Sequence, residues 1–230
     1  MEFDLVNTFK DTDAQFPNTC LPPSILANKL KELGINNDSK IVIYDRHGVY
    51  SSPRAWWLLK QLGHKNVFVL NGGLPNWIQK GEQIADSYSI KTTIGNFEPS
   101  STRTPLQTNK DLLTQLNNPN QLTIDARSNK RFLGLEPEPR DGLRSGHIPN
   151  SKNLHYSSLV KNNHLISKSD IQTLFNELDY TNKTITYTCG SGITACILAL
   201  AGSEIGIHQF SIYDGSWTEW GSLNQLPIEK

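Results

Sequence analysis

The clearest pattern of hydrophobic and polar positions lies near the C-terminal end of the chain. Residues 184–188 (Thr-Ile-Thr-Tyr-Thr) are β-branched and aromatic, which predicts a buried strand. Residues 194–201 are mostly small and apolar, which predicts a helix packed against a sheet. A short glycine-containing turn separates the two segments and begins with Cys189. The pattern therefore predicts a strand, a turn and a helix, with a thiol at the first position of the turn.

The same order of strands and glycines occurs twice, at an offset of 143 positions. The predicted strands 41–44 and 67–70 correspond to 184–187 and 210–213. Identical residues at this offset include Tyr44 and Tyr187, Gly63 and Gly206, Gly72 and Gly215, and Trp77 and Trp220. Because strands alternate with helices, each copy is predicted to be an α/β unit with a parallel sheet and helices on both faces.

The repeat also predicts the domain organisation. We expect a first domain over residues 1–82, a linker rich in Ser, Thr, Asn and Pro over 83–120, and a second domain over 121–230. The second copy begins with a predicted strand, 121–125, and a turn at 146–149 that have no counterpart in the first. The first copy is therefore expected to have an incomplete start and to expose edge groups or apolar surface.

Composition narrows the function. The 230 residues include 22 basic and 22 acidic ones, and a formal net charge of zero argues against a general polyanion partner and favours a small-molecule substrate. No apolar run approaches the roughly 18 residues that a membrane helix needs, and no signal peptide is visible. Three cysteines without a Cys-x-x-Cys pair support neither a disulfide framework nor a zinc site, and we expect a cytoplasmic protein.

The turn at Cys189 has the properties of a nucleophile's position. Successive backbone N–H groups in such a turn point inward, at the start of a helix whose dipole favours negative charge. Glycines let a substrate approach the backbone closely. The position of Cys189 is occupied in the first copy by Arg46, so that copy has the loop without a nucleophile. Cys196, inside the predicted helix, is interpreted as structural, and Cys20 fits no pattern.

Four segments together resemble the 3-mercaptopyruvate sulfurtransferase branch of the two-domain rhodanese-like sulfurtransferases. The segments are Cys189-Gly190-Ser191-Gly192-Ile193-Thr194-Ala195, Asp125 to Arg140, Ser145-Gly146-His147-Ile148-Pro149, and Gly215-Ser216-Trp217-Thr218-Glu219-Trp220. The resemblance implies two tandem rhodanese-like domains, the first apparently truncated at its N-terminus. It also implies that Cys189 and Ser191 are catalytic.

The resemblance further implies the substrate-binding residues. Thiosulfate-preferring members carry Arg-Lys-Gly after the cysteine, whereas this chain has Gly190-Ser191-Gly192, as mercaptopyruvate enzymes do. Arginines that match Arg131 and Arg140 hold the keto acid in those enzymes, and a guanidinium suits a carboxylate. The alternative is that both arginines make structural ion pairs with Glu136, Glu138 or Asp141. The N–H groups of Gly190, Gly192, Ile193 and Thr194 are expected to bind anionic sulfur.

Other polar residues in these segments are interpreted as structural. His147 is expected to fix a turn, Glu219 to take part in core packing and ion pairing, and Asp45 to support the first copy's loop. Mercaptopyruvate enzymes often carry an Asp and a His that act with the loop serine. In this chain Asn18 or its neighbours occupy the region where that His is expected.

The mechanism that the resemblance implies is sulfur transfer without a metal or organic cofactor. Cys189 attacks the sulfur of 3-mercaptopyruvate, leaving pyruvate and a cysteine persulfide, and a thiol acceptor such as thioredoxin, a small thiol or cyanide takes the outer sulfur. A thiosulfate sulfurtransferase and a non-enzymatic rhodanese-fold binding module are the alternatives. A Cys-dependent phosphatase is excluded because Ala195 stands where the phosphate-binding arginine of Cys-x5-Arg is required.

Overall fold

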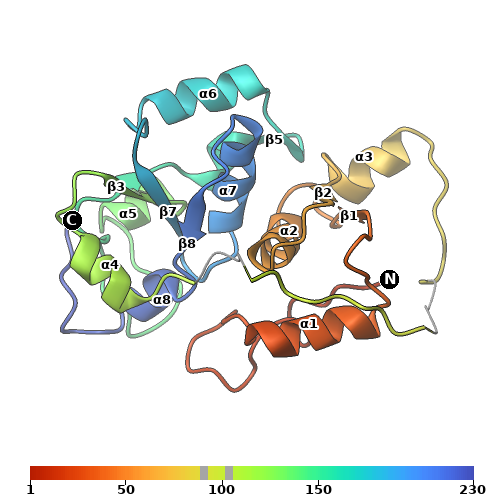
Figure 1. Cartoon of the computed structure of the whole chain (residues 1–230). Coiled ribbons are helices and arrows are strands. Elements are labelled where there is room, and N and C mark those ends of the chain that lie inside the picture. The colour runs from red at the N-terminus through yellow and green to blue at the C-terminus, as the bar shows by residue number, and fades with distance from the viewer. Residues whose placement is uncertain (89–92, 102–105) are drawn as a thin grey trace.

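The computed structural model describes residues 1–88, 93–101 and 106–230. Two α/β halves lie side by side (Figure 1). The first half contains α1 (Pro23–Glu32), β1 (Ile41–Ile43), α2 (Ser52–Gln61), β2 (Val67–Val69) and α3 (Gly73–Gln79). The second half contains α4 (Asn109–Gln115), β3 (Gln121–Asp125), α5 (Asn129–Phe132), β4 (Lys152–Asn153), η1 (Tyr156–Leu159), β5 (Val160–Lys161), β6 (His164–Leu165), α6 (Lys168–Asn176), β7 (Thr184–Thr188), α7 (Ala195–Glu204), β8 (Phe210–Ile212) and α8 (Ser216–Trp220).

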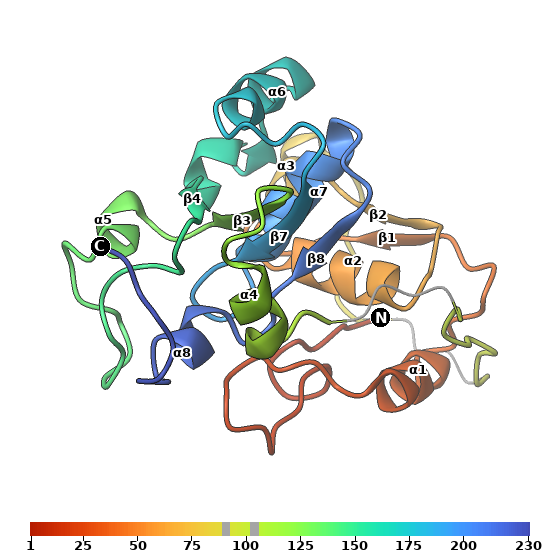
Figure 2. The ribbon, with the colours of Figure 1, turned by 60° about the vertical axis from the view of Figure 1, so that its left-hand side comes forward.

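A four-stranded parallel sheet forms the centre of the second half, in the order β4-β3-β7-β8. Strands β3 and β7 pair over five residues, from Gln121 opposite Thr184 to Asp125 opposite Thr188. Helices flank this sheet (Figure 2), which confirms the predicted α/β class with parallel strands. The strand predicted over 184–188 is β7, and the helix predicted from 194 begins at Ala195.

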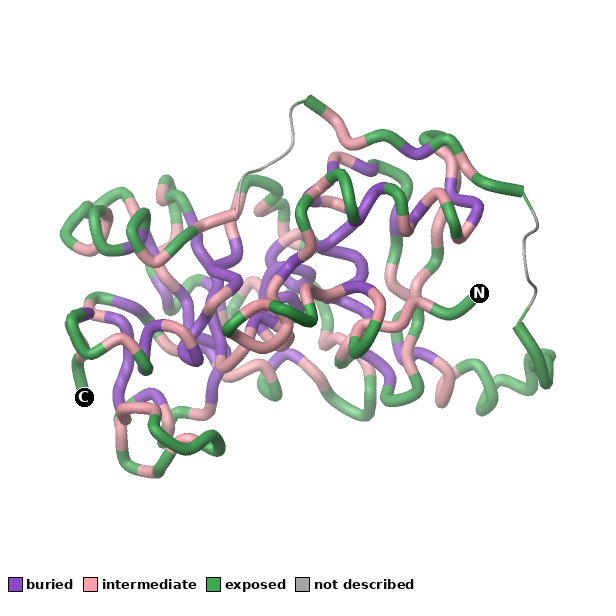
Figure 3. The backbone as a smooth tube through the Cα atoms, turned by 90° about the horizontal axis from the view of Figure 1, so that it is seen from below, coloured by how far each residue is buried: buried purple, intermediate pink, exposed green. Residues whose placement is uncertain are grey.

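The first half contains a much smaller sheet. Strands β1 and β2 form a two-stranded parallel pair, in which Val42 lies opposite Phe68. Val42 is 55% exposed and Phe68 is 48% exposed, and Tyr44 just after β1 is also exposed. The prediction that the first copy exposes apolar surface is therefore confirmed. Figure 3 shows that buried residues gather in the second half and where the two halves meet.

Helix α7 lies between the two halves. It packs on β7 and β8 on one side and on α2 of the first half on the other. Residues 195–202 of α7 are all buried, as expected for an apolar helix covered on every side. Helix α2 contributes Trp56 and Trp57 to the same core, so the two halves share one hydrophobic interior.

The predicted linker, 83–120, is partly ordered against the second half. Helix α4 begins with a capping box in which Thr108 and Asp111 bond each other's backbone N–H. Its Leu112 joins a second core cluster with Tyr213, Trp217 and Trp220. Residues 89–92 and 102–105 of this segment lie outside the described residues, and the predicted domain boundaries stay predictions. No helix in the described part of the chain is long and apolar enough to cross a membrane.

Candidate active site

Cys189 lies directly after β7, at the carboxyl edge of the four-stranded sheet, and is 2% exposed. Its Sγ accepts a hydrogen bond from the Gly192 N–H at 3.1 Å. Its backbone is held from α8, because the Ser216 hydroxyl accepts from the Cys189 N–H at 3.3 Å and the Trp217 N–H donates to the Cys189 carbonyl at 2.9 Å. The thiol predicted as the nucleophile therefore sits in a turn whose geometry is fixed by two elements.

The loop that follows offers further N–H groups. Gly192 has a φ of +81°, and a Cβ there would lie 3.0 Å from the Asp214 carbonyl oxygen, so this position requires glycine. In the described part of the chain, the N–H groups of Gly190, Ser191, Ile193 and Thr194 have no protein acceptor. These are the donors that the binding of anionic sulfur requires.

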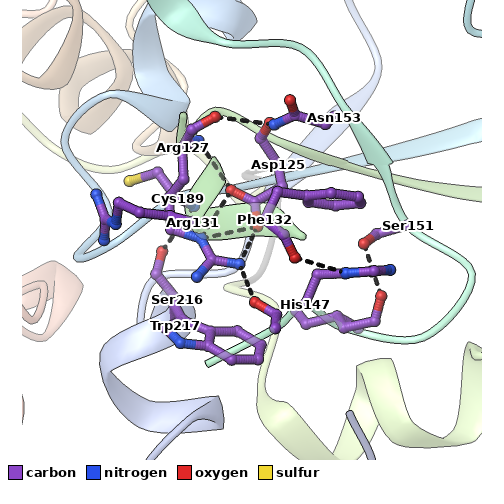
Figure 4. Close-up of polar contacts among 12 residues, drawn as sticks. Asp125, Arg127, Arg131, Phe132, His147, Ser151, Asn153, Cys189, Ser216 and Trp217 are labelled. Atoms are coloured by element: carbon purple, nitrogen blue, oxygen red, sulfur yellow. Dashed lines mark hydrogen bonds and ion pairs between the residues drawn. The ribbon is translucent and has the colours of Figure 1, made fainter. Parts of the chain in front are cut away.

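Arg131, on α5, lies next to the loop. A Cβ built on Gly190 would be 3.1 Å from its Nη2, and Figure 4 shows its guanidinium beside Cys189. Arg131 also pairs with Glu138 at 2.5 Å, while its side chain stays 21% exposed. The Glu138 carboxylate, 1% exposed, also binds Arg127 at 2.8 Å. The ion pair considered from the sequence is thus present with Glu138, and it orients Arg131 at the loop rather than removing it.

Arg140 lies in an exposed part of the segment between α5 and β4. Among the described residues it makes no ion pair with Glu136, Glu138 or Asp141, and no hydrogen bond or ion pair joins it to the loop. Glu136 instead accepts from the Ser128 hydroxyl at 2.7 Å. No ion pair in the described residues supports the structural alternative for Arg140, and its role in holding a donor stays a prediction.

Two further residues, one beside Cys189 and one beside Arg131, escaped sequence reasoning. Burial, followed by the neighbouring Tyr156 and Cys189, raises the pKa of Tyr50, which belongs to the first half. The Tyr50 and Tyr156 rings meet edge to face at 6.0 Å. Burial, and then the charge of Arg131, lowers the pKa of His155, whose Nδ1 lies 2.7 Å from the Ser157 hydroxyl. The available signal in the sequence was that Tyr50 closely follows the first copy's loop at Arg46.

The first half also reaches the back of the loop. The Asn18 side-chain amide donates to the Ser191 carbonyl at 3.1 Å and to its hydroxyl at 3.0 Å. Arg54, on α2 and 2% exposed, pairs with Asp214 at 2.7 Å and donates to the Gly192 carbonyl at 3.1 Å. No sequence pattern distinguished Arg54, which shares α2 with one other charged residue, Lys60.

The residues interpreted as structural have structural contacts. The His147 ring stacks on Phe132 at 3.8 Å and its Nδ1 bonds the Phe132 carbonyl at 2.8 Å, so it joins its segment to the end of α5. Glu219 accepts hydrogen bonds from Tyr213 and Asn109, and it makes no ion pair with any other described residue. Uncharged polar groups face its carboxylate in the described part of the chain.

The other two thiols are unsuited to nucleophilic attack. Cys196 is fully buried and donates to the Gly192 carbonyl at 3.3 Å, and burial raises its pKa to about 12. Burial likewise raises the pKa of Cys20, whose Sγ accepts from Arg54 at 3.2 Å. Among the described residues, no group of three or more His, Cys, Asp or Glu side chains could hold a metal ion.

A cavity of about 750 Å³ lies between the halves, at a distance from this chemistry. It is lined by residues of α2, β2, α6, α7 and β8, among them Trp56, Phe68, Leu200 and Phe210. None of the residues predicted for the active site lines it. The loop at Cys189, not this cavity, therefore carries the candidate chemistry.

Comparisons with known proteins agree with this site. The Rhodanese-like domain family matches residues 6–80 and 108–223. The chain is 32% identical to the 3-mercaptopyruvate sulfurtransferase of Escherichia coli K12 over 97% of its own length and 80% of the relative's. It is 35% identical to the mitochondrial thiosulfate/3-mercaptopyruvate sulfurtransferase 1 of Arabidopsis thaliana, over 99% of its own length and 65% of the relative's.

The chain is also similar to a solved structure of a 3-mercaptopyruvate enzyme. The crystal structure of SseA from Escherichia coli, a 3-mercaptopyruvate sulfotransferase, superposes with a TM-score of 0.80 at 29% identity, over 94% of this chain and 80% of that one. The chain belongs to the rhodanese-like family. Within it, the chain is a two-domain sulfurtransferase of the 3-mercaptopyruvate branch, as the sequence motifs predict.

Proposed function

We propose that the protein transfers sulfur from 3-mercaptopyruvate to a thiophilic acceptor through a persulfide on Cys189. The observation that carries the proposal is the arrangement at the thiol. The Gly192 N–H points at Sγ, further loop N–H groups are unpaired among the described residues, and Arg131 lies beside Gly190. Such preorganised donors stabilise negative charge that develops on sulfur.

The reaction has two steps on the same sulfur. The Cys189 thiolate attacks the sulfur of mercaptopyruvate, the carbon–sulfur bond breaks, and its electron pair leaves as the enolate of pyruvate, which takes up a proton. In the second step a thiolate acceptor attacks the outer sulfur of the persulfide and releases the Cys189 thiolate. The loop N–H groups stabilise anionic sulfur in both steps, and Arg131 is placed to bind the keto acid's carboxylate.

The identity of the sulfur donor is proposed from the charge of the loop that follows Cys189. Gly190, Ser191 and Gly192 add no cation around the thiol, so the loop is poorly suited to the compact dianion thiosulfate. A monoanionic keto acid needs only an arginine such as Arg131. Thiosulfate remains the second candidate because the Arabidopsis relative is named for both donors.

The acceptor and the location also remain proposals. A thiol carrier such as thioredoxin fits the chemistry of the second step, and a small thiol or cyanide would serve as well. Nucleic acid and membrane partners are not expected from the zero net charge and the absence of a long apolar run. A cytoplasmic location stays a prediction.

Intact-mass analysis after exposure to 3-mercaptopyruvate tests the proposal. We expect one added sulfur atom on the native chain, removed by a thiol acceptor, and none on the Cys189→Ser variant. Thiosulfate in place of mercaptopyruvate tests the second candidate in the same assay. If neither donor adds sulfur to the folded chain, the protein is the non-enzymatic binding module instead.

A further inference from the structure

One peptide group in the loop lies between two side chains. The Gly192 N–H donates to the Cys189 Sγ at 3.1 Å, and the Ser191 carbonyl accepts from the Asn18 side-chain amide at 3.1 Å. This N–H and this carbonyl belong to the same peptide unit, which is planar and trans, so they point in opposite directions. Asn18 and the reactive sulfur therefore sit at the two ends of one peptide dipole.

That peptide would be free to rotate without Asn18. It is followed by Gly192, at a φ of +81°, and glycine crosses between backbone conformations at little cost. A rotated peptide would present a carbonyl, not an N–H, to the sulfur. A donor on the carbonyl opposes this rotation, and it also polarises the N–H because hydrogen bonds in a chain strengthen one another.

Asn18 is itself held in place by the first half. Its φ of +60° is a left-handed conformation that asparagine tolerates better than most residues. The Arg54 guanidinium donates to its carbonyl at 2.6 Å, and Arg54 is fixed in turn by Asp214. The second hydrogen of the Asn18 amide is available for the Ser191 hydroxyl, at 3.0 Å.

We infer that Asn18 is a positioning residue that sets the reactivity of the Cys189 sulfur through the Ser191–Gly192 peptide. The inference rests on the proposed function only in one respect, namely that the Cys189 sulfur carries the transferred sulfur atom. The reactivity itself can be measured without any sulfur donor, so failure of one idea is distinguishable from failure of the other.

Other charged and titratable groups also surround the loop. They are Arg131 from α5, Tyr50 before α2, Arg54 on α2, Asp214 after β8 and Cys196 on α7. Each of them is unchanged in a variant that alters only position 18. Variants that differ only at position 18 therefore isolate the effect of the peptide.

The test compares two substitutions of the same kind in the full chain. Asn18→Gly removes the amide and keeps the left-handed backbone. Asn150→Gly is the matched control, because Asn150 also has a φ of +60° and its side-chain amide bonds a backbone carbonyl, that of Leu116, at 3.0 Å. The measurement is the rate of alkylation of Cys189 by iodoacetamide, followed by peptide mass spectrometry between about pH 6 and 9, around the range of ordinary thiols.

We expect Asn18→Gly to slow alkylation at pH 7 by about tenfold, the factor that corresponds to 1.4 kcal/mol, and to move the midpoint of the rate curve to higher pH. Asn150→Gly should match the native chain. Asn18→Asp, which replaces the donor by a carboxylate facing the Ser191 carbonyl, should be at least as slow and serves if Asn18→Gly does not fold. In turnover, kcat should fall with little change in KM for mercaptopyruvate.

An unchanged rate and midpoint in Asn18→Gly would overturn the inference, whatever the variant's melting temperature. An equal slowing in Asn150→Gly would also overturn it, because the effect would then be general destabilisation. If alkylation slows as expected but the native chain never forms a persulfide, the positioning role stands and the proposed sulfur transfer fails.

Discussion

The two loops that follow β1 and β7 occupy corresponding places in the repeat but use their N–H groups differently. In the first loop, the Asp45 carboxylate accepts from the N–H groups of His47, Tyr50, Ser51 and Ser52 at 2.8 to 3.0 Å. In the second loop Thr188 stands at the position of Asp45. There the Gly192 N–H points at the Cys189 sulfur, and other N–H groups are unpaired among the described residues.

This difference distinguishes the first copy, which has no nucleophile, from the second copy, which carries Cys189. The first loop contains its own anion, so its donors have no capacity for a ligand. The second loop lacks an internal carboxylate and keeps its donors for anionic sulfur. Loss of the cysteine is therefore only half of the change, because the first loop is also closed to substrate by Asp45.

The largest expected effect is on sulfur-transfer activity, which should depend on the second loop and not on the first. Cys189→Ser should abolish sulfur transfer and leave the fold intact, whereas Cys20→Ser and Cys196→Ser should keep most activity. Adding Arg46→Cys to the Cys189→Ser chain should restore nothing, because Asp45 already occupies the first loop's donors. Pyruvate release and intact mass after exposure to mercaptopyruvate measure both outcomes. A persulfide at position 46 of this double variant would show that the two loops are equivalent.

The equivalent tryptophans should differ in their contribution to stability. Trp220 is completely buried, and its ring N–H donates to the Pro227 carbonyl at 2.7 Å. Trp77 is 38% exposed. We expect Trp220→Ala to lower the free energy of unfolding by about 3–5 kcal/mol, as for other buried tryptophans, and Trp77→Ala by about 1 kcal/mol. Urea unfolding gives both values, and equal losses would mean that the two copies are packed alike.

Arg131 and Arg140 test whether substrate binding belongs to the second half. Arg131→Ala should lower kcat/KM for mercaptopyruvate by an amount that corresponds to about 1.5–3 kcal/mol, the contribution of a charge-assisted hydrogen bond. The melting temperature should change little, because Arg127 still pairs with Glu138. Arg140→Ala is the companion variant, since its exposed side chain has no structural partner among the described residues. A loss seen in melting and not in kinetics would assign Arg131 to the fold.

The smallest expected effect comes from Asp45. Burial acts to raise its pKa, but the backbone donors, led by Ser52, outweigh burial and hold the pKa below the ordinary value. Because the folded-state pKa is lower than the unfolded one, the carboxylate stabilises the protein above about pH 4. This contribution is lost as the pH falls through the folded-state pKa.

Asp45→Asn should therefore cost about 1 kcal/mol at pH 7. The difference from the native chain should shrink as the pH is lowered from about 6 to 3. Urea unfolding at several pH values measures this difference. A difference that does not change with pH would mean that the charge of Asp45 contributes nothing to the first loop.

The sequence predicted the parts of this structure that depend on local pattern. Strands β3 and β7 have the predicted bounds, and the loop at Cys189 follows from its glycines and the helix after it. It could not predict that Arg54 and Asn18 hold this loop, because those contacts join residues more than 130 positions apart. Nor could it decide between the two interpretations of Arg131, since a guanidinium can pair with Glu138 and still face the loop.

The buried pair between Arg54 and Asp214 has a consequence for the time course of synthesis. The chain emerges from its N-terminal end, so Arg54 is made about 160 residues before Asp214, which is roughly 10–30 s at ordinary elongation rates. During that interval the Arg54 guanidinium stays hydrated. The tryptophans of α2 are not yet covered by α7. The face of the first half that packs on α7 therefore stays exposed until α7 and Asp214 have been added.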